Sequence, residues 1–472
     1  MLRVGQALPR LAEDTGIRQL VSSLTGERLF GLNNEGRAEP RLVERWERSA
    51  DGLVWTFALR SGLQFHDGSP VDATQVREIL KDALTEPRAP GFLDVESIEA
   101  TDARTLVVTL NRPSAFLLDD LGGYSLNVVR DGRQIGTGPF VLDTSDDTRI
   151  VLRAFEHYYA GRPGLDRIEL TAYPSVRSAW SAMMRDEIDV LLEVGRDAIE
   201  FVEAESRVSV YSFPRSFVLL LGFNQVHPAL GNPAVRRALN LAIDRNRLVR
   251  ETLRGHGLVA DGFIWPYYWA FDRTVSVYGF DPDHARRLLD EAGFPVKTTA
   301  SGPARFRLSC LLPDDVALFE GFGLFVQKNL YDVGVALDLE PVPSRILMER
   351  FSSGNFDTFL FEMANARSLS WPYRFLHSAA EGSPVLLNWG YRGADEALDR
   401  IRHSADDDQI RAGVSALQRA LYDDPPAVFI SWDERSRAVS RRFDVPARPG
   451  YDVFTSALLW QWKPARALPG TP

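Results

Sequence analysis

The sequence predicts an α/β fold divided into more than one domain, and three observations support this. The chain has 472 residues, which is too many for a single hydrophobic core. Its hydrophobic content of 45% and charged content of 25% are typical of globular rather than disordered proteins. Segments rich in β-branched and aromatic residues alternate with segments that have the 3.6-residue period of amphipathic helices.

The expected strands are of two kinds. Residues 55–60 (WTFALR) alternate in polarity, which predicts a strand with only one buried face. Residues 217–224 (FVLLLGFN) form a nearly continuous apolar run, which is typical of a strand buried on both faces. The other expected strands are 105–110, 149–155, 167–173, 188–194, 208–213, 305–312, 335–342, 356–363 and 427–432.

Three helix starts are marked by capping residues. Asp72 precedes Gln75 by three residues, which is the spacing of a capping box. Asn232 and Asp281 each precede a proline, a residue favoured at the first helical position because its missing N–H costs nothing there. Gly293 predicts the end of the third of these helices. The apolar stripes that follow the caps indicate scaffold helices rather than a cofactor site.

The composition excludes some classes of function. The net charge is −10 and no long basic run is present, which argues against nucleic acid as a partner. The single cysteine, Cys310, lies in an apolar run, so we expect a buried thiol and no disulfide within the chain. No apolar run reaches the length of a membrane span, and residues 1–10 lack the apolar core of a signal peptide. Either the protein is cytosolic, or a leader has been removed and Met1 is not native.

The sequence offers little that indicates catalysis. His66 and Asp67 could form half of a catalytic pair, but they lie in a Gly-bounded turn between a strand and a capped helix, which favours a structural role. The seven histidines are scattered without zinc-binding spacing, and no nucleophile-elbow, P-loop or dinucleotide motif is present. We therefore expect no catalytic residue, no cofactor and no metal site.

Five segments carry a resemblance to a known family. The first is LVERWERSADGLVWTFALRSGLQFHDGSPVDATQVREIL (42–80), which includes the FHDG-x-P sequence. The others, in order, are GTGPF (136–140) and the segments 222–249, 279–295 and 330–363. Together they resemble the large solute-binding proteins of ABC importers, the peptide/nickel/oligosaccharide type called family 5. The resemblance covers nearly the whole chain.

The resemblance implies a periplasmic-binding-protein fold of type II. Such a fold has two α/β lobes, a hinge of two crossing strands and an extra β-rich subdomain in the first lobe. The crossings are expected near 222–228 and 430–436. The first lobe is expected to comprise residues 1–33, 137–224 and 432–472, the subdomain 34–136, and the second lobe 225–431.

The resemblance also implies a function without catalysis. Two lobes would close over a small peptide-like or other polar organic solute and deliver it to the transmembrane permease subunits of an ABC transporter. The protein would be a monomer without a nucleic-acid partner, periplasmic or extracellular, either free or lipid-anchored before leader removal. Two other classes stay open: the ligand-sensing domain of a transcriptional regulator with the same fold, and a hydrolase.

The resemblance also implies where the solute is contacted, namely in two segments of the second lobe, 264–271 and 361–375, which are both rich in aromatics. Two single residues outside them are added. Aromatic side chains offer large, rigid contact areas with polar tips, although the same residues could simply pack loops against the lobes. The predicted contacts are Asn224, Trp265, Tyr267, Tyr268, Trp269, Glu362, Asn365, Arg367, Trp371, Tyr373, Arg374 and Trp389.

One departure from the family pattern bears on the solute. Peptide-binding members often carry an aspartate-rich run after the strand that corresponds to 356–363, where a carboxylate holds the ligand's ammonium group. Here no aspartate occurs between Asp357 and Asp395, and Arg367 and Arg374 lie in that stretch. Because buried guanidinium groups prefer carboxylates or phosphates, a ligand of anionic or hydroxyl-rich character is one hypothesis, and solvated surface arginines are the alternative.

Overall fold

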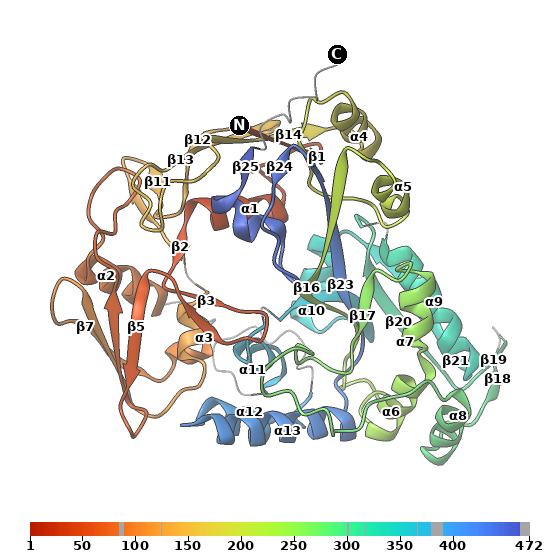
Figure 1. The fold of residues 1–472 in the computed structure, drawn as a ribbon. Helices are drawn as coiled ribbons and strands as arrows, with labels where there is room; N and C mark the ends of the chain where they lie inside the picture. The colour runs from red at the N-terminus through yellow and green to blue at the C-terminus, as the bar shows by residue number, and fades with distance from the viewer. Residues whose placement is uncertain are drawn as a thin grey trace.

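The computed structural model describes residues 1–84, 89–123, 125–299, 302–316, 318–365, 367–378 and 390–462. One long mixed sheet runs through the molecule (Figure 1). Its strands, in spatial order, are β12 (Phe140–Ser145), β13 (Arg149–Ala154), β14 (Arg167–Tyr173), β1 (Leu2–Ala7), β15 (Val190–Leu191), β23 (Ala427–Ser440), β16 (Val208–Phe223), β22 (Thr358–Ala364), β20 (Phe306–Pro313) and β21 (Val335–Val342), with β17 (Gly257–Val259) also paired to β23.

The long antiparallel strands β16 and β23 connect two halves of this sheet. Their pairing shifts register between Pro214 and Val218. On the side of the shift that contains the start of β16, β23 also pairs with β15. On the other side, β16 pairs with β22, and β23 pairs with β17. The two halves are the first and second lobes, and β16 and β23 are the two crossing strands of the expected type II fold. The exact lobe boundaries stay a prediction.

Helices cover both faces of the first-lobe strands. One face packs against α1 (Thr15–Thr25) through a core that includes Leu2 and Ile17. The other face packs against α4 (Val176–Met184) and α5 (Ile199–Glu203). Strand β1 lies between β14 and β15 and is parallel to both, so the N-terminal residues are central to this lobe.

The second lobe has the same layered arrangement. One face is covered by α6 (Pro233–Ala242), α7 (Arg245–Glu251), α8 (Pro282–Glu291) and α9 (Leu318–Asp332), and the other by α10 (Ser344–Ser353), α11 (Ser370–Leu376), α12 (Asp395–Arg402) and α13 (Asp407–Asp423). Cys310 is buried in the first of these cores, as expected, and burial raises the pKa of its thiol to about 12.

A separate antiparallel sheet forms the subdomain at the left of Figure 1. Its strands, in spatial order, are β5 (Val43–Arg48), β6 (Val54–Leu59), β8 (Thr105–Leu110) and β7 (Val95–Ala100), accompanied by α2 (Ala73–Leu84) and α3 (Leu117–Leu121). The shorter elements are β2 (Glu27–Arg28), β3 (Phe30–Leu32), β4 (Ala38–Pro40), β9 (Ser125–Leu126), β10 (Val128–Arg130), β11 (Arg133–Ile135), β18 (Lys297–Thr299), β19 (Gly302–Ala304), β24 (Phe443–Asp444), β25 (Gln461–Trp462), η1 (Pro90–Phe92) and η2 (Val453–Leu459).

The turn at His66 and Asp67 is structural. The His66 backbone N–H donates to the Gly136 carbonyl (2.9 Å), and Nε2 of its ring lies 3.0 Å from the Gly138 carbonyl oxygen. Asp67 accepts from the Ser69 N–H at 3.0 Å, and Gly68 has a φ of 82°. The FHDG turn therefore ties the subdomain to the GTGPF segment, two motifs about 70 residues apart, in keeping with the structural role that the sequence favours.

The expected helix starts are confirmed. Asp72 accepts from the Gln75 N–H at 2.9 Å while the Gln75 side chain accepts from the Asp72 N–H at 3.2 Å, which is a reciprocal capping box. Asn232 and Asp281 cap α6 and α8. The expected strands 208–213 and 217–224 differ from the structure, because β16 continues through Pro214 at the register shift. No helix among the described residues combines the length and hydropathy of a membrane span.

Candidate functional site: a seam between the lobes

Four loops meet where the two lobes and the subdomain face one another, and we call this region the interlobe seam. It comprises residues 33–37 between β3 and β4, 263–269, Asn365 with 367–370, and 450–452. The Trp265 indole N–H donates to the Asn34 carbonyl at 2.8 Å, and the Trp269 backbone N–H donates to the Glu35 carbonyl at 3.0 Å. The loop between β3 and β4 is therefore bound directly to a loop of the second lobe.

Aromatic rings form the second-lobe side of the seam. Trp265 is 1% exposed, and its ring packs edge-on against Trp432 of β23 with centroids 5.1 Å apart. Tyr268 and Trp269 follow, with ring centroids 5.8 Å apart. A Cβ at Gly36, whose φ is 78°, would lie 2.5 Å from the Tyr268 ring. Only glycine permits this approach of the first-lobe loop to the aromatic surface.

Arg37 and Arg367 contribute two cations to the seam. The Arg37 guanidinium lies 3.4 Å from the centroid of the Trp269 ring and pairs with Asp407 at 2.7 Å. The Arg367 guanidinium lies over the rings of Trp265 and Tyr451, at 5.4 and 5.1 Å. Stacking of this kind stabilises a cation that has left water.

Asn365 fixes the backbone that leads to Arg367. Its side-chain amide donates to the Phe263 carbonyl at 2.7 Å, and its backbone N–H donates to the Ser216 carbonyl of β16 at 2.8 Å. Asn365 is buried, so this amide links the two second-lobe loops to a crossing strand. Of the predicted contacts, the structure therefore brings together Trp265, Tyr268, Trp269, Asn365 and Arg367.

The predicted residues on α11 lie next to the seam but face other partners. Tyr373 is buried in the second-lobe core, and its hydroxyl accepts from Arg402 at 2.9 Å. The Arg374 guanidinium lies 4.7 Å from the centroid of the Trp371 ring. Tyr267 is 42% exposed, and its ring packs against that of Trp265.

One predicted contact is not brought to the seam, and another is not described. Asn224 lies just after the far end of β16, where its amide donates to the carbonyls of Phe356 (2.8 Å) and Gly354 (3.2 Å). Trp389 lies outside the described residues. A role for either residue in solute binding stays a prediction.

Asp119 of α3 is a seam residue that the sequence reasoning missed. Its carboxylate accepts from the Ser368 hydroxyl at 2.6 Å and from the Leu369 N–H at 3.1 Å, so it joins the subdomain to the second lobe. Burial, and secondarily the charge of Asp120, raise its pKa to about 7. The pair Asp119–Asp120 within the short apolar segment FLLDDL is the only local signal that could have drawn attention to it.

The raised pKa of Asp119 predicts a pH-dependent stability. The folded protein holds this proton more tightly than the unfolded chain, whose pKa is near 3.8, so the contribution of Asp119 is most favourable below pH 3.8 and is lost as the pH rises to about 7. Between pH 4 and pH 8 the wild-type free energy of unfolding should fall by roughly 1–3 kcal/mol more than that of Asp119→Asn. Urea unfolding at both pH values measures the difference, and parallel losses in the two proteins would contradict the expectation.

A cluster of charged side chains lies around the crossing strands, close to the seam. Asp433 of β23 accepts from Arg215 at 3.1 Å and from Arg435 at 2.7 Å, and it also pairs with Arg196. Glu362 of β22 is partly buried near this group. Burial, and secondarily the charge of Asp433, raise the pKa of Glu362 to about 7, while the arginines act in the opposite sense. These side chains come from both lobes, so lobe movement would change their electrostatic environment.

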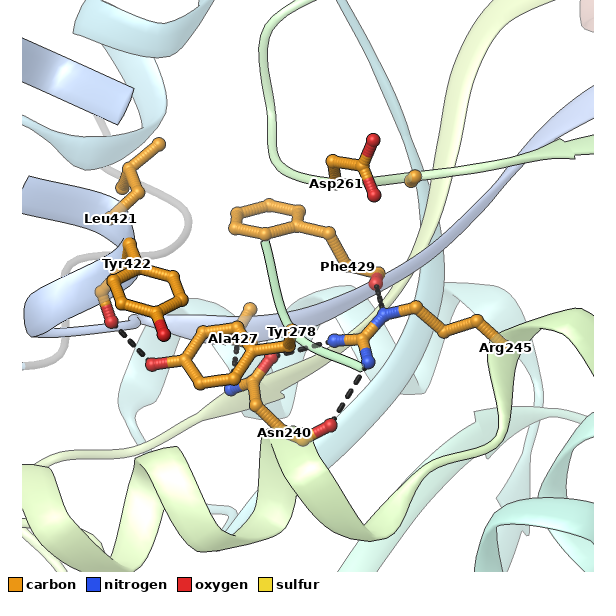
Figure 2. A pocket seen from close by; sticks show the side chains of 9 residues that line it. Asn240, Arg245, Asp261, Tyr278, Leu421, Tyr422, Ala427 and Phe429 are labelled. Carbon is orange, nitrogen blue, oxygen red and sulfur yellow. Dashed lines mark hydrogen bonds between the residues drawn. The ribbon is translucent and has the colours of Figure 1, made fainter. Parts of the chain in front are cut away.

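A small pocket in the second lobe serves the scaffold (Figure 2). Arg245 donates to the Phe429 carbonyl at 2.6 Å and to both the carbonyl and the side-chain oxygen of Asn240, at 2.9 and 2.7 Å. The Asn240 amide in turn donates to the Ala427 carbonyl. Because these groups satisfy one another, the pocket is a poor candidate for a solute site.

Among the described residues, no three His, Cys, Asp or Glu side chains are grouped so that they could hold a metal ion. The seam offers aromatic faces, amide groups and charges instead, which is chemistry suited to holding an organic molecule.

The architecture defines a class: a two-lobed α/β protein whose lobes are joined by two strands and meet at a polar and aromatic seam. Residues 37–384 match the family described as "Bacterial extracellular solute-binding proteins, family 5 Middle", and the chain belongs to this family. The family matches the resemblance that the motifs predict.

Solved structures agree with the type II fold over nearly the whole chain. NikA from Brucella suis in complex with Fe(III)-EDTA has a TM-score of 0.84 at 19% identity and covers 98% of this chain and 100% of that one. DppA from Helicobacter pylori in complex with the peptide STSA has a TM-score of 0.81 at 19% identity and covers 98% of each chain. At these identities the likeness concerns the fold alone.

Two curated relatives are similar over a shorter stretch. Heme-binding protein A of Haemophilus influenzae is 28% identical over 295 residues, which are 54% of each chain. The glutathione-binding protein GsiB of Escherichia coli K12 is 28% identical over 305 residues, 61% of this chain and 59% of that protein. This chain thus spans between about half and three-fifths of the length of these relatives.

Proposed function

We propose that this protein binds a small organic solute between its lobes and delivers it to the permease of an ABC importer. The observation that carries the proposal is the seam itself, where loops of both lobes and the subdomain converge. In the part of the chain that the structure describes, β16 and β23 are the strands that connect the lobes within the sheet. Such a connection lets the lobes open and close as bodies, and a solute held between them shifts the balance toward closure.

The seam suits a solute with both flat and polar parts. Trp265 and Trp269 carry aromatic rings, and their N–H groups donate to the Asn34 and Glu35 carbonyls across the seam. Opening of the lobes would free these donors and acceptors for a solute. Closure would remove the solute from water and strengthen each polar contact. The permease would then recognise the closed arrangement of the lobes, and no bond-making step is needed.

Family membership and the names of the relatives support the remaining parts of the proposal. The family description places its members outside the cell membrane, and the two curated relatives are named for binding haem and glutathione. We therefore propose that this protein acts in the periplasm or outside the cell, and we keep the expectation that it is a monomer and does not transform its solute. A peptide-like or other polar organic molecule fits the seam better than a bare metal ion.

The substitution Trp269→Ala tests the location of the site. Trp269 is partly buried at the seam, so its loss should weaken solute binding at least about tenfold, which corresponds to 1.4 kcal/mol. Isothermal titration with trialanine, glutathione and the nickel–histidine complex would measure binding to the wild type and the variant. Trp180→Ala is the matched control, because Trp180 packs against Phe201 in the first lobe, on the α4–α5 side. Equal affinity in Trp269→Ala and wild type would place the site elsewhere.

A further inference from the structure

We propose that the contact between the subdomain and the second lobe forms with uptake of a proton by the adjacent carboxyl groups of Asp119 and Asp120. The contact is then tight in mildly acidic solution and loosens as the pH rises above neutrality. This inference rests on the proposed function in one respect, because loosening of the contact would open the solute site.

Asp120 differs in its partners from the other buried aspartates of the described residues. Each of the others has an arginine at ion-pair distance: Asp94 with Arg402 at 2.9 Å, Asp189 with Arg3 at 2.8 Å and Asp433 with Arg435 at 2.7 Å. Asp120 instead accepts from the Gly91 N–H at 2.6 Å. In the part of the chain that the structure describes, no lysine or arginine nitrogen lies within ion-pair distance of Asp120 or Asp119. Two neighbouring carboxyl groups of α3 are therefore enclosed without a direct counter-charge.

The partners of Asp119 belong to the second lobe and are neutral. Its carboxyl group accepts from the Ser368 hydroxyl at 2.6 Å and from the Leu369 N–H at 3.1 Å. The Ser368 hydroxyl lies 2.9 Å from that of Ser370, and both serines are buried. Neutral donors stabilise an ionised carboxylate less than a guanidinium does. The carboxyl group that joins the subdomain to the second lobe is thus one that favours a bound proton.

The acidity of the pair agrees with this geometry. Burial raises the pKa of Asp119 to about 7, and the charge of Asp120 acts in the same sense. Burial also raises the pKa of Asp120, to about 6. Because the two groups are adjacent and interact, the proton belongs to the pair rather than to one residue.

The charged and titratable groups that face the pair do not remove this preference. Burial outweighs the effect of Arg374 on α11 and Arg402 on α12, which lower the pKa of Asp120 from beyond ion-pair distance. Arg402 is itself engaged by Asp94. Tyr268, on the second-lobe loop, stays neutral because burial raises the pKa of its hydroxyl well above the ordinary value. No neighbouring group among the described residues thus supplies the missing charge.

Movement of the subdomain away from the second lobe would return both carboxyl groups to water. Their pKa would then fall toward the ordinary value of 3.8, so the open form releases the proton that the closed contact holds. The raised pKa favours the contact fully below about pH 3.8, and this contribution is lost as the pH rises through 6 and 7. Closure of the lobes is therefore coupled to proton uptake near neutral pH.

Hydrogen exchange followed by mass spectrometry at pH 6 and pH 8 tests the proposal without a solute. The segment measured is 367–376, which contains the Leu369 N–H that donates to Asp119. After correction for intrinsic exchange rates, wild-type protection of this segment should fall at least about tenfold from pH 6 to pH 8. The variant Asp119→Asn keeps an acceptor oxygen but cannot ionise at this position, so its protection should fall less than about threefold.

Asp407→Asn is the matched control. Asp407 pairs with Arg37 at the same seam, but its side chain is 49% exposed, so this variant should keep the wild-type pH dependence. Equal wild-type protection at pH 6 and pH 8, or an equal fall in wild type and Asp119→Asn, would overturn the proposal. Because no solute is present, either result would leave the proposed function standing.

Discussion

Replacing Asp94 with asparagine is expected to lower the free energy of unfolding by about 3–5 kcal/mol. Asp94 of the subdomain is completely buried and pairs at 2.9 Å with Arg402 of the second lobe, whose side chain is only 6% exposed. The variant leaves the Arg402 charge buried with the Tyr373 hydroxyl as its remaining side-chain partner among the described residues. Urea unfolding followed by circular dichroism measures the loss.

A second partner of the Asp94 carboxylate, Arg112, provides a control. Arg112 pairs with the other oxygen of Asp94 at 2.7 Å, but the Arg112 side chain is 57% exposed. Water can replace such a partner, so Arg112→Met should cost less than about 1 kcal/mol. Equal losses for Asp94→Asn and Arg112→Met would show that the buried pair does not stabilise the contact between the subdomain and the second lobe.

The substitution Trp265→Ala is expected to cost about 3–5 kcal/mol of stability and to abolish measurable solute binding. Trp265 is 1% exposed, packs on Trp432 and donates to the first-lobe loop through the Asn34 carbonyl. Its removal leaves a cavity in the core and also removes one of the two rings that hold Arg367. Chemical unfolding measures the loss of stability, and isothermal titration with a solute that binds the wild type measures the loss of binding.

The substitution Tyr267→Ala, two residues further along, is a control for the effect of Trp265→Ala on core packing. Its side chain is 42% exposed, so Tyr267→Ala should change the free energy of unfolding by less than about 1 kcal/mol. If Trp265→Ala binds solute as the wild type does, the aromatic face of the seam is not part of the site, whatever its effect on stability.

Much of the fold follows from local patterns in the sequence. Capping residues such as Asp72, Asn232 and Asp281 accept hydrogen bonds from N–H groups of the first turns of their own helices. A few residues of sequence are therefore enough to predict where such a helix starts. Alternating or continuous apolar runs mark most strands in the same way. The expected break between the strands 208–213 and 217–224 is absent, because β16 runs through Pro214, where its pairing with β23 shifts register.

The site is less visible because its residues come from distant parts of the chain. The clustering of aromatics at 264–271 drew attention to Trp265 and Trp269, and both lie at the seam. Asp119 and Tyr451 join the same seam from positions more than 300 residues apart. Asn224 is the opposite case. It lies in a segment that matches the family pattern, but the structure places it just after the C-terminal end of β16, away from the seam. Such proximity depends on the tertiary fold, which local patterns do not encode.

The central claim is that two lobes on crossing strands enclose a solute without transforming it. Small-angle X-ray scattering of the refolded protein, with and without a solute that isothermal titration shows to bind, tests this claim most directly. The solute is afterwards recovered, and its mass is determined by mass spectrometry. The account predicts a smaller radius of gyration in the presence of the solute and recovery of the solute with its mass unchanged. An unchanged radius of gyration at saturating solute, or a solute that is consumed, would contradict it.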